Sequence, residues 1–336
     1  MNTSKVPCVL FCIWLAGCGS DETKPQETTP WRMPLAQLPG ALISVTGTAS
    51  DDVWLVGGDP GDGKGGMLLH YDGAELKRIA NTAPDLWWAH GFVGGPVFIS
   101  GAQGTILKWS GGKLSKMPAP SSQGIVFGVW GADPNDMWAV GGDAFGGNAF
   151  VWRYDGTTWA DAPNLPAMPI SQYFKVWGTS ASDVRIVGAD GVALHYDGKA
   201  FQVLPTPTTF RLLTTHTNGD GLWAAVGAGS RGVILEDSGP GFVDVSPSES
   251  PKALFGVRLE ADTGYAVGVN GTLLRRAAGV WRDEKHGLDV FDDFHAVWID
   301  PDAGVWAVGG AIFAPPLVDG MLLYKGKQNL PSAYVD

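Results

Sequence analysis

The stretch DPNDMWAVGGDAFGGNAFVWRYDGTTW, residues 133–159, contains the two features that decide the fold. The first is a short apolar run closed by glycine, Met137-Trp138-Ala139-Val140-Gly141. The second is a turn that ends in glycine, Tyr154-Asp155-Gly156, before a further apolar residue. An Asp-Gly turn between two such runs is a hairpin signal, for which we expect type I′ geometry. The stretch therefore predicts short β-strands joined by tight turns.

Both features recur seven times along the chain. Glycines close the apolar runs at Gly57, Gly101, Gly141, Gly188, Gly227, Gly268 and Gly309. A second glycine ends each turn, at Gly73, Gly111, Gly156, Gly198, Gly239, Gly279 and Gly326. The first set is spaced by about 42 residues, which is the length of one propeller blade.

Each repeat has room for four strands. An inner strand of the type Phe174–Trp177 leads through an acidic turn to the glycine-closed run, and a third strand such as Val192–Tyr196 precedes the outer strand Phe201–Leu204. The chain holds 48 glycines and 15 tryptophans, as expected for many tight turns between packed strands. We predict an all-β fold, a seven-bladed β-propeller of four-stranded antiparallel blades, over residues 31–336.

A ring of blades must be closed, and little chain remains after Gly326. The segment WRMPLAQL, Trp31–Leu38, is similar to outer-strand segments such as WADAPNLP at 159–166. We predict that Trp31–Leu38 is the outer strand of blade 7. The alternative places Gln328–Ala333 there, with the N-terminal segment alongside.

The first 30 residues have the composition of a processed leader. Lys5 precedes the apolar run Val9–Leu15, which is shorter than the roughly 20 apolar residues of a membrane span. Leu15-Ala16-Gly17-Cys18 resembles the lipobox of bacterial lipoproteins, and this resemblance implies removal of residues 1–17 and acylation of Cys18, with chains such as palmitate. Residues 18–30 would then be a lipidated, disordered tether.

Composition excludes several classes. The chain has 23 basic against 34 acidic side chains, a net charge of −11, which argues against nucleic-acid binding. Its three cysteines, Cys8, Cys12 and Cys18, all lie in the leader region, so the predicted domain has no thiol chemistry.

The repeat also resembles two propeller families. The pattern Val-Gly-x followed by Tyr-Asp-Gly-x-x-Trp, as at Tyr154–Trp159, is similar to photosystem II assembly-factor-like propellers with BNR-type repeats and to tectonin-type propeller lectins. The resemblance covers about residues 40–330. The Asp-box of the BNR group, Ser-x-Asp-x-Gly-x-x-Trp, survives only as the remnant Asp155-Gly156-Thr157-Thr158-Trp159.

Loop length separates the two faces of the predicted ring. Long loops between the second and third strands occur at Gly58–Gly66, Gly142–Asn148 and Gly310–Gly320, and binding residues are often found on such loops. The candidate ligand-face residues on them are Phe145, Ile312, Phe313, Pro315 and Pro316.

Two other sets of residues are candidate sites. Asp59 and Asp62 are weak calcium candidates, because the terminal glutamate of a calcium-binding loop is missing. Arg185 replaces a large apolar residue in the second-strand column, so it should pair with an acid, and it marks a site if it does not. We expect no cofactor and no metal.

The sequence therefore favours a non-catalytic scaffold that binds a protein or peptide on the long-loop face. It would be a monomer, held by Cys18 to a membrane of the bacterial cell envelope, at the outer membrane or cell surface. A carbohydrate-binding, lectin-like propeller is the alternative. A propeller hydrolase comes third, because no catalytic motif is found.

Overall fold

The computed structural model describes residue 1 and residues 29–143, 145–239, 241–249 and 251–336. The predicted signal peptide, Cys18 and most of the predicted tether lie outside these residues. Among the described residues, no helix has the length and apolar character needed to cross a membrane.

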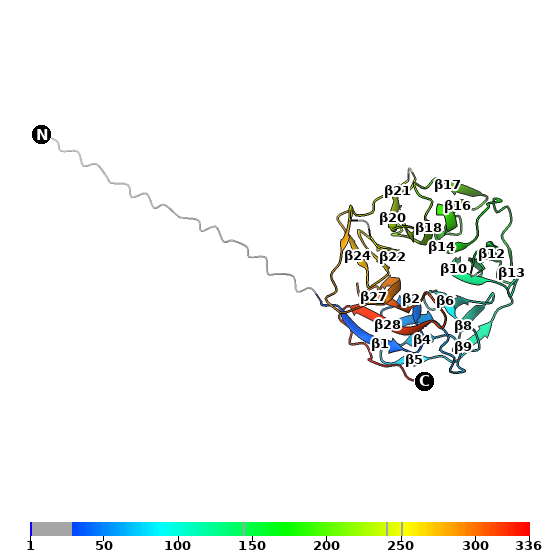
Figure 1. The fold of residues 1–336 in the computed structure, drawn as a ribbon, viewed down its shortest axis with the longest axis horizontal. Helices are drawn as coiled ribbons and strands as arrows, with labels where there is room; N and C mark the ends of the chain where they lie inside the picture. Colours follow the sequence, from blue (N-terminus) through cyan, green and yellow to red (C-terminus); the bar gives the residue numbers. More distant parts are fainter. Residues whose placement is uncertain (2–28, 144, 240, 250) are drawn as a thin grey trace.

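Seven four-stranded antiparallel sheets form a ring, which confirms the predicted seven-bladed β-propeller (Figure 1). One short 3₁₀ turn, η1 (Ala189–Gly191), is the only helical element of the described part. Blade 1 contains β2 (Leu42–Ala49), β3 (Asp52–Gly57), β4 (Leu68–Tyr71) and β5 (Leu76–Arg78). Blade 2 contains β6 (Leu86–Gly91), β7 (Val97–Gly101), β8 (Ile106–Ser110) and β9 (Lys113–Lys116). Blade 3 contains β10 (Ile125–Asp133), β11 (Asp136–Gly142), β12 (Phe150–Tyr154) and β13 (Trp159–Asp161).

The other four blades follow in chain order. They are β14 (Tyr173–Ser180), β15 (Asp183–Gly188), β16 (Ala193–Tyr196), β17 (Phe201–Leu204); β18 (Arg211–Thr217), β19 (Trp223–Ala228), β20 (Gly232–Asp237), β21 (Val243–Asp244); β22 (Leu254–Glu260), β23 (Thr263–Gly268), β24 (Leu273–Ala277), β25 (Val280–Asp283); and β26 (Asp293–Ile299), β27 (Val305–Ala311), β28 (Val318–Lys325) with β1 (Arg32–Leu38).

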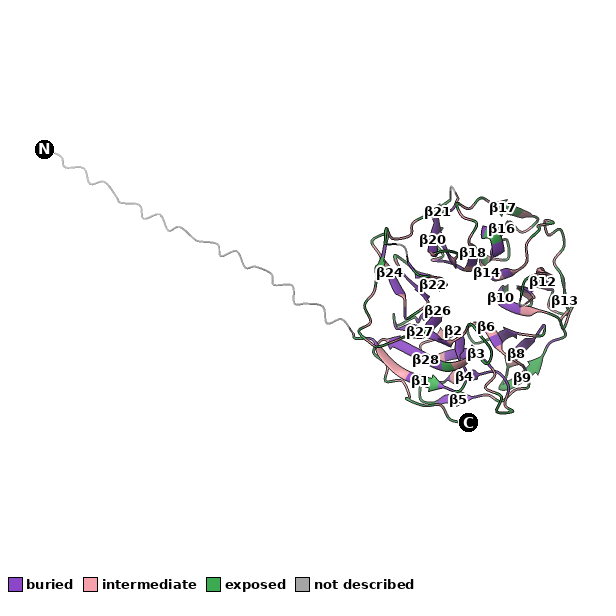
Figure 2. Cartoon of the chain, viewed as in Figure 1, coloured by how far each residue is buried: buried purple, intermediate pink, exposed green. Residues whose placement is uncertain are grey.

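Figure 2 shows that buried residues lie mainly on the strands, and in second strands such as β3 and β11 every residue after the first is buried. Most of their residues are apolar because neighbouring blades cover both of their faces, and the exceptions include Arg185 and the first residues of β3, β11 and β15, which are aspartates. Their closing glycines are required by close approach to the inner strand. A Cβ at Gly57 would lie 1.8 Å from the Ala41 carbonyl oxygen, and one at Gly141 would lie 2.0 Å from that of Ile125. Any larger residue would push the two strands apart, which explains the repeated glycine.

The Tyr-Asp-Gly turns form a small hydrogen-bonded unit. At Tyr71-Asp72-Gly73, the tyrosine hydroxyl donates to the Gly73 carbonyl at 2.9 Å, and Asp72 accepts from the backbone N–H of Glu75 at 2.9 Å. Positive φ occurs at Gly73, 89°, but not at the next residue. The predicted type I′ turn is therefore wrong in detail, because that type needs positive φ at both central residues, and a glycine at the first one fits type II′.

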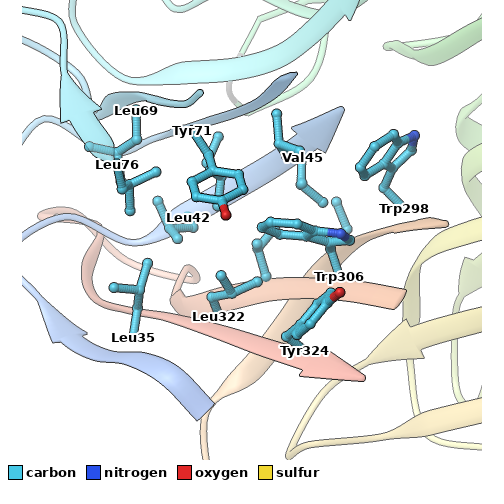
Figure 3. Close-up of a cluster of buried hydrophobic side chains, with 14 of the residues drawn as sticks. Leu35, Leu42, Val45, Leu69, Tyr71, Leu76, Trp298, Trp306, Leu322 and Tyr324 are labelled. Carbon is cyan, nitrogen blue, oxygen red and sulfur yellow. The ribbon is translucent and has the colours of Figure 1, made fainter. Parts of the chain in front are cut away.

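Both ends of the chain take part in closing the ring. β1 pairs with β28 as the outer strand of blade 7, with Leu35 opposite Leu322. Figure 3 shows Leu35 beside Trp306 and Leu322 of blade 7 and Tyr71 of blade 1, in one buried cluster.

The C-terminal segment crosses from blade 7 to blade 1 rather than forming a strand of blade 7. Val335 makes a parallel bridge to β5, in which the Arg78 N–H donates to the Val335 carbonyl at 2.7 Å. The Arg32 side chain donates to the Gly326 carbonyl at 3.0 Å, so the two ends of the chain also contact each other.

Candidate binding site at the mouth of the central channel

Every inner strand begins with the same irregularity. A β-bulge shifts the register near its start, between Val126 and Gly128 in blade 3 and between Tyr173 and Lys175 in blade 4. A bulge redirects a side chain and commonly lies beside a functional site. The seven residues at the bulge, here called the mouth ring, are Ile43, Trp87, Phe127, Phe174, Leu213, Phe255 and His295.

Six of these side chains line a cavity of about 440 Å³. Most of the ring is a continuous set of aromatic contacts. Trp87 meets Phe127 edge-on with centroids 5.2 Å apart, and Phe127 lies 5.4 Å from Phe174. On the neighbouring blades 6 and 7, Phe255 and His295 stack with ring centroids 5.8 Å apart. The mouth therefore offers an apolar, largely aromatic surface of the kind that binds ligands in preformed pockets.

The long loop of blade 7 covers one side of the ring. Ile312 packs against Ile43, which is fully buried and so does not reach the cavity. Phe313, 71% exposed, lies 5.6 Å from Phe255 and lines the cavity. Two of the five long-loop candidates, Ile312 and Phe313, thus belong to this site.

The cavity wall contains the basic side chains Arg211 and Lys175. Arg211 is exposed at its rim, whereas Lys175 is buried, donates to the Phe127 carbonyl at 3.2 Å and lies 3.3 Å from the Trp88 ring centroid. Burial lowers the pKa of Lys175 well below its ordinary value. The lining contains no Asp or Glu, although the chain carries 34 of them. The mouth is thus suited to an apolar ligand that bears a negative group.

His295 is held as a neutral ring. Its Nδ1–H donates to the Ile43 carbonyl at 2.7 Å, and burial lowers its pKa to about 3. The charge of Lys175 lowers that pKa further.

A second hollow of about 240 Å³ continues from the mouth toward the junction of blades 4 and 5. It shares Gln172, Phe174, Arg211, Ala228 and Gly229 with the mouth cavity. Together the two form a groove that leaves the ring where blades 4 and 5 have short loops. A groove of this shape fits an extended ligand better than a compact one.

No protein-family model matches the chain, and no curated protein matches it. Solved structures do match. YCF48 from Cyanidioschyzon merolae is 14% identical, with a TM-score of 0.64 over 89% of this chain and all of that one. A YCF48 bound to D1 peptide is 17% identical, with a TM-score of 0.63 over 90% of this chain and 98% of that one.

An extracellular domain of a hybrid two-component system from B. thetaiotaomicron is 11% identical, with a TM-score of 0.62. The alignment covers 84% of this chain but only 40% of that one. At these identities the likeness shows the propeller fold alone.

The remaining loop candidates lie away from the mouth cavity. Phe145 is fully exposed on the blade 3 loop, and Pro315 and Pro316 are exposed on the blade 7 loop. Asp59 and Asp62 are engaged by other groups: Asp59 accepts from the Gly61 N–H, and Asp62 accepts from Arg78 Nη1 at 2.6 Å. Among the described residues, no three acidic, histidine or cysteine side chains are grouped as metal ligands.

Arg185 has the partner that its position requires. Its Nη1 donates to Asp237 at 2.8 Å, and its guanidinium lies 4.4 Å from the Trp223 ring centroid between blades 4 and 5. Burial lowers its pKa despite this ion pair. Arg185 thus pairs with an acid, as its place in the second-strand column predicts, and packs between the two blades.

Sequence reasoning missed most of the mouth ring. The signal was present as a column of large residues at the start of the inner strands, such as Phe127, Phe174 and Phe255. Strand periodicity alone assigns this column to packing. The bulge that redirects it toward the channel involves backbone pairing between strands, which the sequence pattern did not reveal.

Proposed function

We propose that this chain is a non-catalytic binding protein whose channel mouth holds an extended apolar peptide that carries an acidic group. The observation that carries the proposal is the aromatic mouth ring with the exposed cation Arg211, the buried amine of Lys175 and no carboxylate in the lining of the mouth cavity. The groove toward blades 4 and 5 provides the length that a peptide needs, and its one carboxylate, Asp190, lies outside the mouth cavity. Support of a general kind comes from the D1 peptide bound to YCF48, a neighbour in fold.

The chemistry of the mouth supports holding rather than reaction. Lys175 and His295 both donate to backbone carbonyls, which fixes their orientation. An arrangement for proton transfer would instead leave such groups facing a reacting atom.

We also propose that Cys18 is acylated and anchors the propeller at the bacterial cell envelope. The support is the lipobox-like Leu15–Cys18 and the fold shared with extracellular domains of bacterial proteins. Mass spectrometry of the purified chain tests this. We expect an N-terminal acylated Cys18 in the membrane fraction, and a Cys18→Ser variant that leaves that fraction. An uncleaved or unmodified Cys18 would contradict the proposal.

The peptide proposal is tested by selecting binders to the full chain from displayed random peptides. We expect apolar, aromatic sequences that contain an acidic residue. Phe174→Ser and Phe313→Ser should each weaken binding at least about tenfold, as truncation of an aromatic residue at the centre of an interface does. The matched control is Phe291→Ser, since Phe291 is 83% exposed outside the cavity. Equal affinities in all three variants would rule out the mouth as the site.

One hollow of the described surface supports glycan binding as a second function. It measures about 360 Å³, lies beside the blade 3 loop, and is lined by Asp143, Asn148, Asp161, Phe150 and Trp152 among others. The carboxylates and the amide can hydrogen-bond sugar hydroxyls, and an adjacent aromatic ring can stack on the apolar face of a sugar. A glycan array on the full chain, with Asp161→Asn against the exposed control Asp289→Asn, tests it. Glycan binding lost in Asp161→Asn would favour this site over the peptide.

A further inference from the structure

Toward the opposite end of the central channel, the inner strands carry a second ring of side chains. These side chains come three residues after the mouth ring on each inner strand, so they lie roughly 10 Å deeper at the usual rise of a strand. They are Thr46, His90, Trp130, Trp177, His216, Arg258 and Trp298.

Trp177 lies close to three other members of this ring. His216 lies 4.5 Å from it, His90 lies 5.7 Å from it, and Arg258 lies 5.4 Å from its ring centroid. The ring therefore groups one cation and two imidazoles around one indole.

Arg258 forms no direct ion pair among the described residues. Its Nε is buried without a hydrogen-bond partner, and no described carboxylate forms an ion pair with its guanidinium. Burial lowers its pKa to about 10, against a smaller opposite effect of Glu260, so the group stays charged at neutral pH. An uncompensated charge in such a place is costly, and proteins rarely keep one without an anion or polar partner.

His216 presents a further free donor beside the same Trp177 indole. The Leu259 N–H donates to its Nδ1 at 3.2 Å, so Nε2 carries the hydrogen of the neutral ring. Nε2 is buried without a partner, and the residue is only 6% exposed. Burial lowers the pKa of His216 well below its ordinary value, so it donates as a neutral group.

The acidic turns at this end of the channel already have other partners. Asp52 accepts from His70 at 2.8 Å, Asp136 from Arg153 at 3.0 Å, and Asp183 lies 2.9 Å from His195. These carboxylates therefore pair with side chains on the third strands rather than with Arg258.

We propose that this end of the channel binds a carboxylate, with the Arg258 guanidinium and the His216 Nε2–H as its donors and the Trp177 indole as its wall. A carboxylate matches the planar guanidinium fork through two parallel hydrogen bonds, which a spherical halide does not. Arg258, Trp177 and His90 are partly exposed, so the site is open to solvent. The carboxylate could belong to a small acid or to the end of a peptide chain. This site is separate from the mouth cavity and does not depend on the peptide proposed to bind there.

The test measures thermal denaturation of the full chain in sodium acetate against sodium chloride at equal ionic strength. We expect acetate to raise the midpoint by about 3 °C at ten times its dissociation constant. Trialanine and its C-terminal amide distinguish the two sources: a response to acetate alone indicates a small acid, and one to trialanine but not its amide indicates a chain terminus. An equal response to chloride and acetate would overturn the assignment.

Two variants locate the effect. Arg258→Met should abolish the acetate response and should leave the midpoint in chloride no lower than that of the parent, because an unpaired buried charge is removed. Arg275→Met, an exposed arginine on β24 of the same blade, is the matched control and should keep the response. If Arg258→Met does not fold, Arg258→Lys and His216→Phe should each weaken ¹⁹F-detected trifluoroacetate binding at least fivefold. An unchanged affinity in both would refute the site.

Discussion

Blades 4 and 7 have the same four-stranded order but are built in different ways. Blade 4 is continuous from β14 to β17, and a Tyr-Asp-Gly hairpin holds its outer strand in place. Blade 7 takes its outer strand, β1, from the other end of the chain. The two outer strands also differ in burial. Val203 of β17 is 51% exposed, whereas Leu35 of β1 is 1% exposed. An outer strand without a local turn must be held by buried anchors, since closing a long loop costs entropy.

The same two blades shape opposite parts of the mouth. Blade 4 contributes Phe174 with only the short turn η1 beside it, and the groove leaves the ring there. Blade 7 contributes His295, and its long loop places Ile312 and Phe313 over the ring. The blade that closes the ring thus also limits access to the mouth.

The largest effect should follow from removing Trp31–Leu38. This deletion leaves blade 7 with three strands and exposes the apolar faces that Trp31, Leu35 and Leu38 cover. Burying each of these is worth about 1.5–3 kcal/mol, which together approaches the stability of a whole domain. We expect no cooperative unfolding transition by circular dichroism. Adding a synthetic peptide of residues 30–40 should restore the transition, and a stable ring without it would refute the closing role of β1.

A single substitution sharpens the same contrast. Leu35→Ala should lower the free energy of unfolding by about 2–5 kcal/mol, as expected for a fully buried leucine. Val203→Ala in blade 4 should change it by less than about 0.5 kcal/mol, because the side chain is half exposed. Urea denaturation measures both. Similar losses in the two variants would mean that the two outer strands are held in the same way.

Blade 7 also shows what the sequence could and could not predict. The repeat glycines predicted the ring because their cause, contact with a neighbouring strand, is the same in every blade, as at Gly57 and Gly141. The likeness of Trp31–Leu38 to outer strands pointed to β1, which the structure places in blade 7. The parallel bridge of Val335 to β5 could not be predicted in this way, because an isolated bridge of one residue pair produces no repeating pattern in the sequence.

The candidate site was less predictable than the fold. Long-loop reasoning found Ile312 and Phe313, whose exposure is a property of the loop itself. It could not find Lys175 or Arg258, because a cation in the channel differs from a surface cation only through its neighbours on other blades.

Removing the C-terminal residues Val335 and Asp336 should have a smaller effect than either change to β1. Two backbone hydrogen bonds join Val335 to β5, and each such bond contributes about 0.5–1.5 kcal/mol. We therefore expect a loss of about 1–3 kcal/mol in urea denaturation, with the ring intact. The control is Asp336→Asn, which removes only the exposed ion pair with Lys64. A loss as large as that of Leu35→Ala would show that the C-terminal segment is an equal part of the closure.

The smallest expected effect is a pH dependence of stability. It comes from His295 of blade 7, the one titratable side chain of the mouth ring. Burial lowers the pKa of His295 to about 3, whereas an unfolded histidine titrates near 6.5. Above pH 6.5 both states are neutral at this residue, and below it the unfolded chain binds a proton that the folded ring resists. Stability should therefore fall as the pH falls from 6.5 toward 3, by about 1 kcal/mol at pH 5.5 for this residue.

His295→Gln should remove that share of the fall in stability between pH 6.5 and pH 5.5, while Phe174→Gln, at the same position of blade 4, should lower stability equally at the two pH values. Parallel pH profiles for the parent and His295→Gln would mean that the imidazole is not held neutral by the fold.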